Sequence, residues 1–206
     1  FDDLNKAISY SMTSFLTTGG IRGRKKQAAG QYHPRSFNMG LKIEVFKATG
    51  GFAFTRQGED IDFSIRILDK GFKIALIPDA VVFHKRRATL KKFYKQVYNF
   101  GQARWGLHKL YPGTLKLAHL FPSAFTLYLF SIPLVIAVAL GLNWHWFIPT
   151  FWTLPAISFT VLNFVFASGK HGSLKIGLLG LATSYIQLVG YGLGFMRYAI
   201  QRGIFG

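Results

Sequence analysis

The chain has 206 residues and carries 25 Lys and Arg against eight Asp and Glu, which gives a net charge of +17 at pH 7. It contains no cysteine, so disulfide frameworks and thiolate metal sites are excluded. All eight acidic residues and 21 of the basic ones lie within residues 1–117, whereas residues 118–206 are almost entirely apolar. This distribution predicts a polar region with a net charge of +13, followed by an apolar region of membrane type. The chain starts at Phe1 without a signal-peptide pattern, and we expect it to be a fragment.

Residues 2–16 have helical periodicity, and Asp2 and Asp3 at the start of this helix are expected to cap it rather than to bind metal. A basic loop follows at residues 21–34. It either binds the phosphate groups of a donor or acceptor, or is simply a solvated loop or one that faces anionic lipid, and the sequence leaves these interpretations open. The candidate phosphate ligands in this loop are Arg22 and Arg24.

The next elements are short and end in a glycine pair. Residues 36–40 resemble a buried strand, and residues 43–48 a short helix. Gly50 and Gly51 permit a turn with positive φ.

The most distinctive stretch begins at Gly58 and presents three carboxylates at the predicted start of a helix that ends at Gly71. Its apolar face is predicted to contain Ile61, Ile65 and Leu68. The helix dipole keeps carboxylates in a first turn ionised, which suits a base or a metal ligand, but such residues are also common caps. The carboxylates are Glu59, Asp60 and Asp62. Residues 72–77 and 80–83 then have the composition of two strands, ending at His84.

The segments NMGLKIEVFKATGGF and RQGEDIDFSIRILDKGFKIALIPDAVVFH resemble the C-terminal half of a family 2 glycosyltransferase domain of GT-A fold. The matching residues are Asn38, Met39, Gly50, Gly51, Phe52, Gly58, Glu59, Asp60, Asp62 and His84. Phe63 stands where the family more often has Leu. The resemblance covers residues 1–117, and it implies an α/β fold for the polar region, as a partial GT-A domain over residues 1–87.

The resemblance also implies roles for these residues. Asp60 would be the catalytic base, with Glu59 and Asp62 orienting the acceptor or the base. Four residues would wall the acceptor site: Asn38, Met39, Gly50 and Gly51. His84 would help to bind a divalent metal, Mg or Mn, on the diphosphate of a nucleotide-sugar donor. The family's metal-binding Asp-x-Asp motif follows an apolar strand, and no such strand precedes Asp2 and Asp3, so we expect this motif to be missing with the N-terminal half and the fragment to be inactive alone.

Residues 88–116 are predicted to form a basic amphipathic helix. Residues 80–117 hold nine Lys and Arg and no acid, but they contain no nucleic-acid readout motif. Because the segment leads into an apolar span, we expect it to lie on anionic membrane lipid and not on nucleic acid. Arg104 and Trp105 resemble the end of the Gln-x-x-Arg-Trp motif of processive family members, which implies acceptor binding. Gly101 occupies the Gln position, and Trp105 as an interface anchor is the alternative.

Residues 117–206 contain three apolar stretches of membrane-spanning length, at about 117–142, 146–167 and 176–196. An all-α region of three transmembrane helices is therefore expected, with the polar region cytoplasmic. This arrangement would place Arg197 and Arg202 outside, against the usual charge bias. Either the basic region overrules that bias or the third segment does not fully cross.

Together with the apolar stretches, the resemblance implies a multi-pass inverting glycosyltransferase of the cell membrane. Its expected partners are a nucleotide-sugar donor, a lipid-linked or saccharide acceptor, and membrane lipids. Two alternatives remain open: a processive polysaccharide synthase, and a non-catalytic basic module that binds anionic lipid or a partner subunit.

Overall fold

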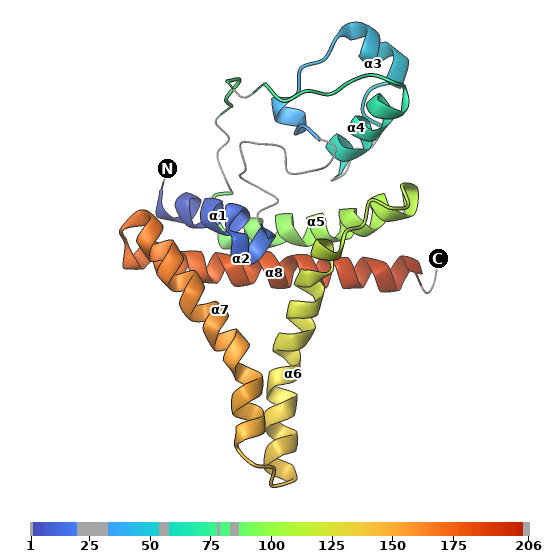
Figure 1. The fold of residues 1–206 in the computed structure, drawn as a ribbon. Helices are drawn as coiled ribbons and strands as arrows, with labels where there is room; N and C mark the ends of the chain where they lie inside the picture. Colours follow the sequence, from blue (N-terminus) through green and yellow to red (C-terminus); the bar gives the residue numbers. More distant parts are fainter. Residues whose placement is uncertain (1, 20–32, 54–57, 78, 83–86, 204–206) are drawn as a thin grey trace.

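A computed structural model of the chain describes residues 2–19, 33–53, 58–77, 79–82 and 87–203. Its helices form an upper layer of α3 and α4, a middle layer of α1, α2, α5 and α8, and a lower hairpin of α6 and α7 (Figure 1). The helices are α1 (Asp3–Thr13), α2 (Phe15–Thr18), the 3₁₀ helix η1 (Ser36–Asn38), α3 (Ile43–Thr49), α4 (Glu59–Asp69), α5 (Leu90–Leu110), the 3₁₀ helix η2 (Leu117–His119), α6 (Phe121–Gly141), α7 (Phe147–His171) and α8 (Leu174–Gly203).

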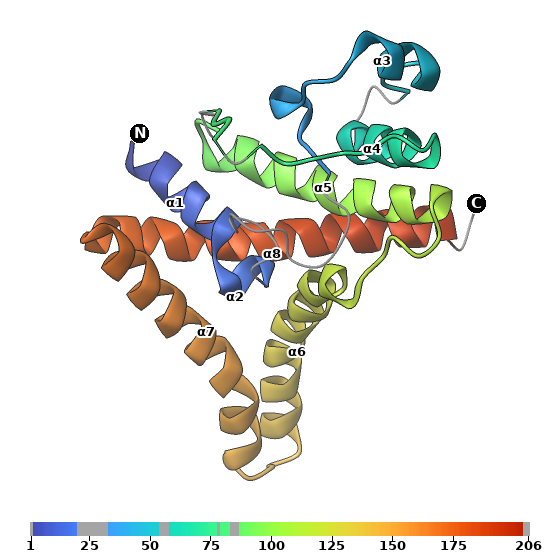
Figure 2. The ribbon, with the colours of Figure 1, turned by 45° about the horizontal axis from the view of Figure 1, so that its top comes forward.

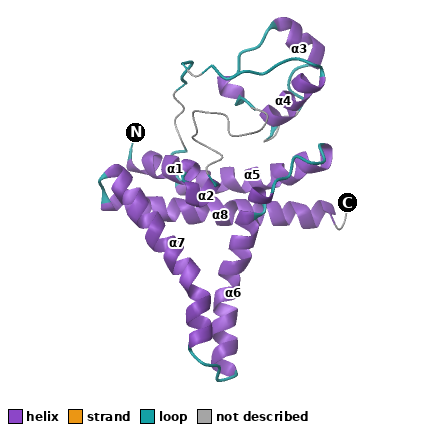
Figure 3. Cartoon of the chain, in the orientation of Figure 1, coloured by secondary structure: helices purple, strands orange, loops and turns teal. Residues whose placement is uncertain are grey.

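The predicted α/β fold is wrong for the described residues, which contain helices and no β-strand (Figure 3). Residues 36–38 form a 3₁₀ helix, and residues 72–77 and 80–82 are irregular. Ile77 and Val81 are each 68% exposed. A strand needs backbone hydrogen bonds to a neighbouring strand. No described segment supplies that partner, and apolar composition alone does not create a strand.

The helix predictions are confirmed, and the end signals act as expected. The side chain of Asp2 accepts a hydrogen bond from the backbone N–H of Asn5 at 2.6 Å, which caps α1. At the end of α4, Gly71 adopts a φ of 79°. Its N–H bonds to the carbonyl of Leu68, and the N–H of Phe72 bonds to that of Ile67. This pair of bonds is the glycine-terminated motif that closes many helices.

The core lies where α1 and α5 meet α8. The side chains of Ile8 and Met12 from α1 pack with Phe93 and Val97 from α5, and Ile186 of α8 covers them. Burial of such side chains stabilises the fold by about 1.5–3 kcal/mol each. The middle layer is therefore a packed platform (Figure 2).

Glycine residues bring α5 and α8 into backbone contact. A Cβ added at Gly194 would lie 2.0 Å from the carbonyl oxygen of Tyr98, and one at Gly101 would lie 2.1 Å from that of Tyr191. Only glycine allows this approach. On the opposite face of α8, Gly192 contacts α6 in the same way. The glycines of the last apolar stretch thus serve helix packing, as predicted.

The α6–α7 hairpin projects away from the platform (Figure 1). α6, α7 and residues Leu174–Gln201 of α8 are each long and apolar enough to cross a membrane. Within the hairpin, the hydroxyl of Tyr128 donates to the carbonyl of Trp152 at 2.7 Å, and the indole of Trp152 donates to Ser131 at 2.9 Å. Most of the side chains of the two helices face outward, as expected of helices surrounded by lipid.

Candidate active site

The first turn of α4 presents its carboxylates in three different environments. Gly58 precedes the helix with a φ of 101°, a conformation that favours glycine. Asp60 is 8% exposed, and its Oδ1 accepts the N–H of Ile61 at 2.9 Å. Its Oδ2 accepts a bond from Nη1 of Arg35 at 3.0 Å, and that arginine side chain is 43% exposed. Glu59 is partly exposed beside it.

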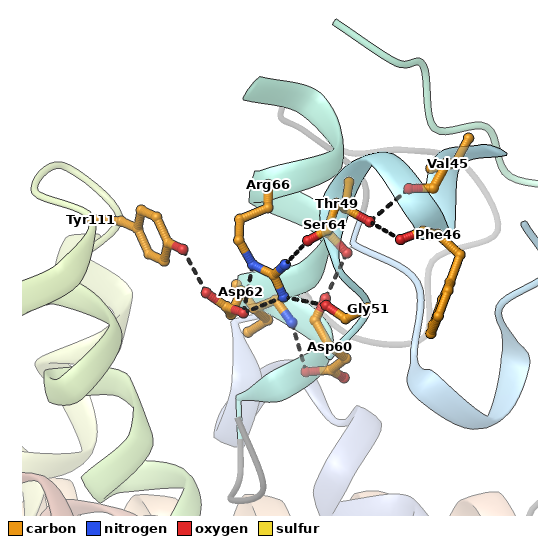
Figure 4. Close-up of polar contacts among 10 residues, drawn as sticks. Val45, Phe46, Thr49, Gly51, Asp60, Asp62, Ser64, Arg66 and Tyr111 are labelled. Atoms are coloured by element: carbon orange, nitrogen blue, oxygen red, sulfur yellow. Dashed lines mark hydrogen bonds and ion pairs between the residues drawn. The ribbon is translucent and has the colours of Figure 1, made fainter. Parts of the chain in front are cut away.

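Asp62 is held by Arg66 in a network that also fixes the glycine turn (Figure 4). Nη2 of Arg66 lies 2.9 Å from Oδ2 of Asp62, whose side chain is 2% exposed. The same guanidinium donates to the carbonyls of Thr49 at 2.6 Å and Gly51 at 2.7 Å. The ion pair joins residues one helical turn apart, and its link to the Gly50-Gly51 turn was not predicted. Both glycines adopt the expected positive φ.

Tyr111, at the end of α5, completes this network. Its hydroxyl donates to Oδ1 of Asp62 at 2.5 Å, so the side chain of Asp62 is bonded on both oxygens. Burial, together with the bond to Asp62, raises the pKa of Tyr111 to about 12 and keeps its proton in place. A Cβ added at Gly58 would contact Leu107 of α5 at 3.2 Å. α4 is therefore docked on α5, which sets the position of Asp60.

Positive charge gathers around His33, which is itself within electrostatic reach of Asp60. Three cations lie within electrostatic reach of the ring of His33, as does Asp60 itself. We call these cations the basic cluster: Arg35, Arg104 and Lys116. Burial and then the charge of Arg104 lower the pKa of His33. Burial, followed by Arg104 and Lys116, lowers the pKa of His119 to about 4. Both rings are therefore neutral at pH 7, and the basic cluster carries the charge.

The remaining predicted residues are dispersed. Asn38 is exposed and Met39 partly exposed around η1. Arg104 lies near Asp60 through the shared neighbour His33, but Trp105 packs edge-on against Phe195 of α8 at 5.4 Å. The side chains of the Arg-Trp pair thus lie in different surroundings, Arg104 near His33 and Trp105 against α8. Arg22, Arg24 and His84 lie outside the described residues.

The face of α4 that is buried also differs from the predicted one. Phe63 and Ile67 are buried, and the ring of Phe52 lies 4.6 Å from that of Phe63. The predicted face of Ile61, Ile65 and Leu68 is only partly covered. Sequence reasoning also missed Arg35 and Tyr111, because each reaches the acidic turn from a distant part of the chain and neither belongs to a local motif.

The expected divalent metal does not fit the carboxylates of the described residues. These residues contain no group of three His, Cys, Asp or Glu side chains that could hold an ion. Asp60 and Asp62 are each paired with an arginine. We therefore assign no metal ligand among them, and Mg or Mn stays a prediction.

Comparison with known proteins decides the family. A family model described as glycosyl transferase family group 2 matches residues 36–167, which include the acidic turn, α5 and most of the hairpin. The chain belongs to this family. The resemblance inferred from the Gly-Gly-Phe and Gly-Glu-Asp segments is therefore confirmed. No solved structure matches the chain.

Two relatives resemble the chain over different lengths. The succinoglycan biosynthesis protein ExoA of Rhizobium meliloti (strain 1021) is 25% identical over 203 residues, which cover 96% of this chain and 57% of that protein. A dolichyl N-acetyl-alpha-D-glucosaminyl phosphate 3-beta-D-2,3-diacetamido-2,3-dideoxy-beta-D-glucuronosyltransferase of Methanococcus voltae is 35% identical over 75 residues, or 36% of this chain and 23% of that protein. The chain thus spans little more than half of the length of the first relative.

Proposed function

We propose that the chain belongs to a membrane-bound inverting glycosyltransferase, in which Asp60 activates the hydroxyl group of the acceptor. One observation carries this proposal: a largely buried carboxylate is fixed in the first turn of α4, and Asp62 of the same turn is bonded to Tyr111 at the end of α5, the helix that precedes the membrane hairpin. Asp62 is a poorer candidate for the base because its side chain is 2% exposed and is bonded to both Arg66 and Tyr111, whereas the arginine paired with Asp60 is 43% exposed.

In the proposed reaction, Oδ2 of Asp60 accepts the proton of the acceptor hydroxyl while that oxygen attacks C1 of the donor sugar. The bond from C1 to the diphosphate oxygen breaks, and the nucleoside diphosphate leaves with the bonding electrons. Attack opposite the leaving group inverts the anomeric centre. Arg35 is 43% exposed, so its side chain has room to give way to the acceptor at Oδ2. A base positioned in this way contributes a factor of about 10²–10⁴ to the rate.

The basic cluster supports an acceptor or donor that carries phosphate. Arg104 and Lys116 both act electrostatically on the rings of His33 and His119, and arginine binds phosphate oxygens through paired hydrogen bonds. Next to Lys116 lies an apolar hollow of about 360 Å³. It is lined by Leu117, Ala118, Leu120, Phe121 and Ala124. Phosphate-binding charge beside an apolar hollow suits a lipid-linked acceptor.

The names of the relatives also support a lipid-linked or surface saccharide as the acceptor. One is named for succinoglycan biosynthesis, and the other for glucuronosyl transfer to a dolichyl-linked sugar phosphate. We extend from these names only the acceptor class, a lipid-linked or surface saccharide, and not the sugar.

The test is a transfer assay with the full-length protein in membranes. Labelled nucleotide-sugars are added one at a time, and the products are separated into organic-soluble lipid, short aqueous saccharide and filter-retained polymer. Membranes without the protein provide the blank, Asp60→Asn tests the base, and Asp69→Asn, an exposed residue of the same helix, is its matched control. We expect label in the lipid or short saccharide fraction. Label only in polymer would favour a processive synthase, and no label above the blank with any donor would favour a non-catalytic membrane module.

A further inference from the structure

The last helix has the length of a membrane span but not the surroundings of one. In the apolar stretch of α8, 50% of the residues are buried inside the protein, against 17% for α6 and for α7. The apolar character of α8 is therefore largely explained by packing against other helices. Figures 1 and 2 both show α8 running across the ends of α6 and α7 instead of alongside them.

The first half of α8 lies against α1. The ammonium group of Lys175 is 2.9 Å from the carboxylate of Asp3. Two turns further along, the hydroxyl of Thr183 donates to the carbonyl of Ala7 at 3.1 Å. α1 therefore lies beside the first part of α8.

The second half of α8 lies against α5, and the two helices run parallel. Gly190 contacts Val97, Gly194 contacts the backbone of Tyr98, and Arg197 donates to the hydroxyl of Tyr98 at 3.2 Å. The charged residues of α5 exclude it from the hydrocarbon core. They are Lys91, Lys92, Lys95, Arg104 and Lys109.

The hairpin meets α8 through the first turn of α6 and through α7 from its middle onward. Gly192 lies against Pro122 in the first turn of α6. The hydroxyl groups of Tyr185 and Thr160 are 2.7 Å apart, in the later half of α7. The turn at residues 142–146 is the part of the hairpin farthest from α8 (Figures 1 and 2). From Lys175 to Tyr198, α8 extends about 34 Å, which is the thickness of a hydrocarbon core, without approaching that turn.

The distribution of Lys and Arg along the chain agrees with an α8 that does not cross the bilayer. The turn 142–146 contains no Lys or Arg. If α8 crossed the bilayer, Arg197 and Arg202 would join that turn on the side that lacks positive charge. If α8 remained in the plane, all 25 Lys and Arg would lie on one side, as the positive-inside rule favours for short loops.

We infer that α8 lies in the plane of the membrane, within the leaflet on the side of α4 and α5, and that the chain crosses the bilayer twice, through α6 and α7. The partner of its uncovered apolar side is the lipid of that leaflet. The hairpin anchors the protein, while α8 supports α5 and, through α5, the turn that carries Asp60. This inference concerns topology and does not rest on the proposed catalytic activity.

The test uses single cysteines, because the chain has none of its own. Each is introduced into the full-length protein, with any cysteine elsewhere replaced by serine, and is labelled with a membrane-impermeant maleimide. Right-side-out and inverted sealed vesicles are compared. Lys47→Cys in α3 and His145→Cys at the hairpin turn are exposed reference positions for the two sides. Gln201→Cys and Ile200→Cys report the end of α8, where both residues are exposed.

We expect at least one of the two α8 cysteines to be labelled in the vesicle orientation that labels Lys47→Cys, and neither in the orientation that labels His145→Cys. Labelling together with His145→Cys would overturn the inference, since α8 would then cross the bilayer. Labelling of both α8 cysteines only after detergent is added would also overturn it, because that end of the helix would lie inside the hydrocarbon. Sugar transfer is not measured, so failure here is distinct from failure of the proposed function.

Discussion

The contact between α5 and α8 predicts opposite effects for two glycine-to-alanine changes. In Gly194→Ala, the new Cβ would lie 2.0 Å from the carbonyl oxygen of Tyr98, so the two backbones must separate. Overpacking of this kind costs about 1–3 kcal/mol, and the better helix propensity of alanine returns at most about 1 kcal/mol. In Gly169→Ala, on α7, nothing lies within 4 Å of the added Cβ, so only the propensity gain remains.

The assay is thermal unfolding of the detergent-purified protein, followed by the loss of the monodisperse peak after heating. At about 2–4 °C per kcal/mol for a protein of this size, we expect Gly194→Ala to lower the midpoint by several degrees. Gly169→Ala should leave it unchanged or raise it slightly. Equal midpoints for Gly194→Ala and wild type would refute the close packing of α5 on α8, and with it the platform that positions α4.

Three further predictions concern the site. Tyr111→Phe removes a hydrogen bond to a charged carboxylate, so the free energy of unfolding should fall by about 1.5–3 kcal/mol. Tyr94→Phe, on the exposed side of α5, should change it little. Equal thermal midpoints for the two variants would contradict the hydrogen bond from Tyr111 to Asp62. Arg66→Gln leaves the carboxylate of Asp62 buried without its cation, which should lower the free energy of unfolding by about 3 kcal/mol or more. Arg66→Lys should not restore stability because lysine cannot make the forked contact, and resistance to proteolysis measures the stability of both variants. The pKa of His119 is lowered to about 4, below its ordinary value, so the unfolded chain binds the proton more readily. Stability should therefore fall as the pH is lowered from about 6.5 to about 4, by at most about 2 kcal/mol at pH 5, and His119→Gln should reduce this dependence in melts at pH 7 and pH 5.

Local signals predicted the helices well. Gly58, with its positive φ, and the acidic first turn mark the start of α4. Gly71 marks its end, because the N–H groups of Gly71 and Phe72 bond to carbonyls that the helix leaves unpaired. The apolar stretches of the C-terminal region likewise became helices, since their length and lack of charge leave little alternative.

The strands and most of the site contacts were not predictable in this way. Residues 72–77 have the composition of a strand, but a strand exists only with a partner, and composition does not reveal whether one is present. Tyr111 reaches Asp62 across 49 positions, and Arg35 reaches Asp60 across 25. Neither pair has a characteristic spacing: the docking of α4 on α5 creates the first, and the residue that precedes η1 creates the second.

The orientation of α8 was only partly predictable from the sequence. Its length and composition indicated a span, whereas the positions of Arg197 and Arg202 conflicted with one. Composition cannot distinguish apolar residues that face lipid from those that face other helices. The contacts with α1 and α5 make that distinction.

The most direct test of the central claim is the turnover number of Asp60→Asn in the full-length protein, measured with the donor identified by the transfer assay. Asp69→Asn is the control for the charge of the helix, and thermal unfolding is the control for folding. We predict that Asp60→Asn lowers kcat by about 10²–10⁴ while donor affinity and stability stay close to wild type. A kcat within a few-fold of wild type would contradict the assignment of Asp60 as the base.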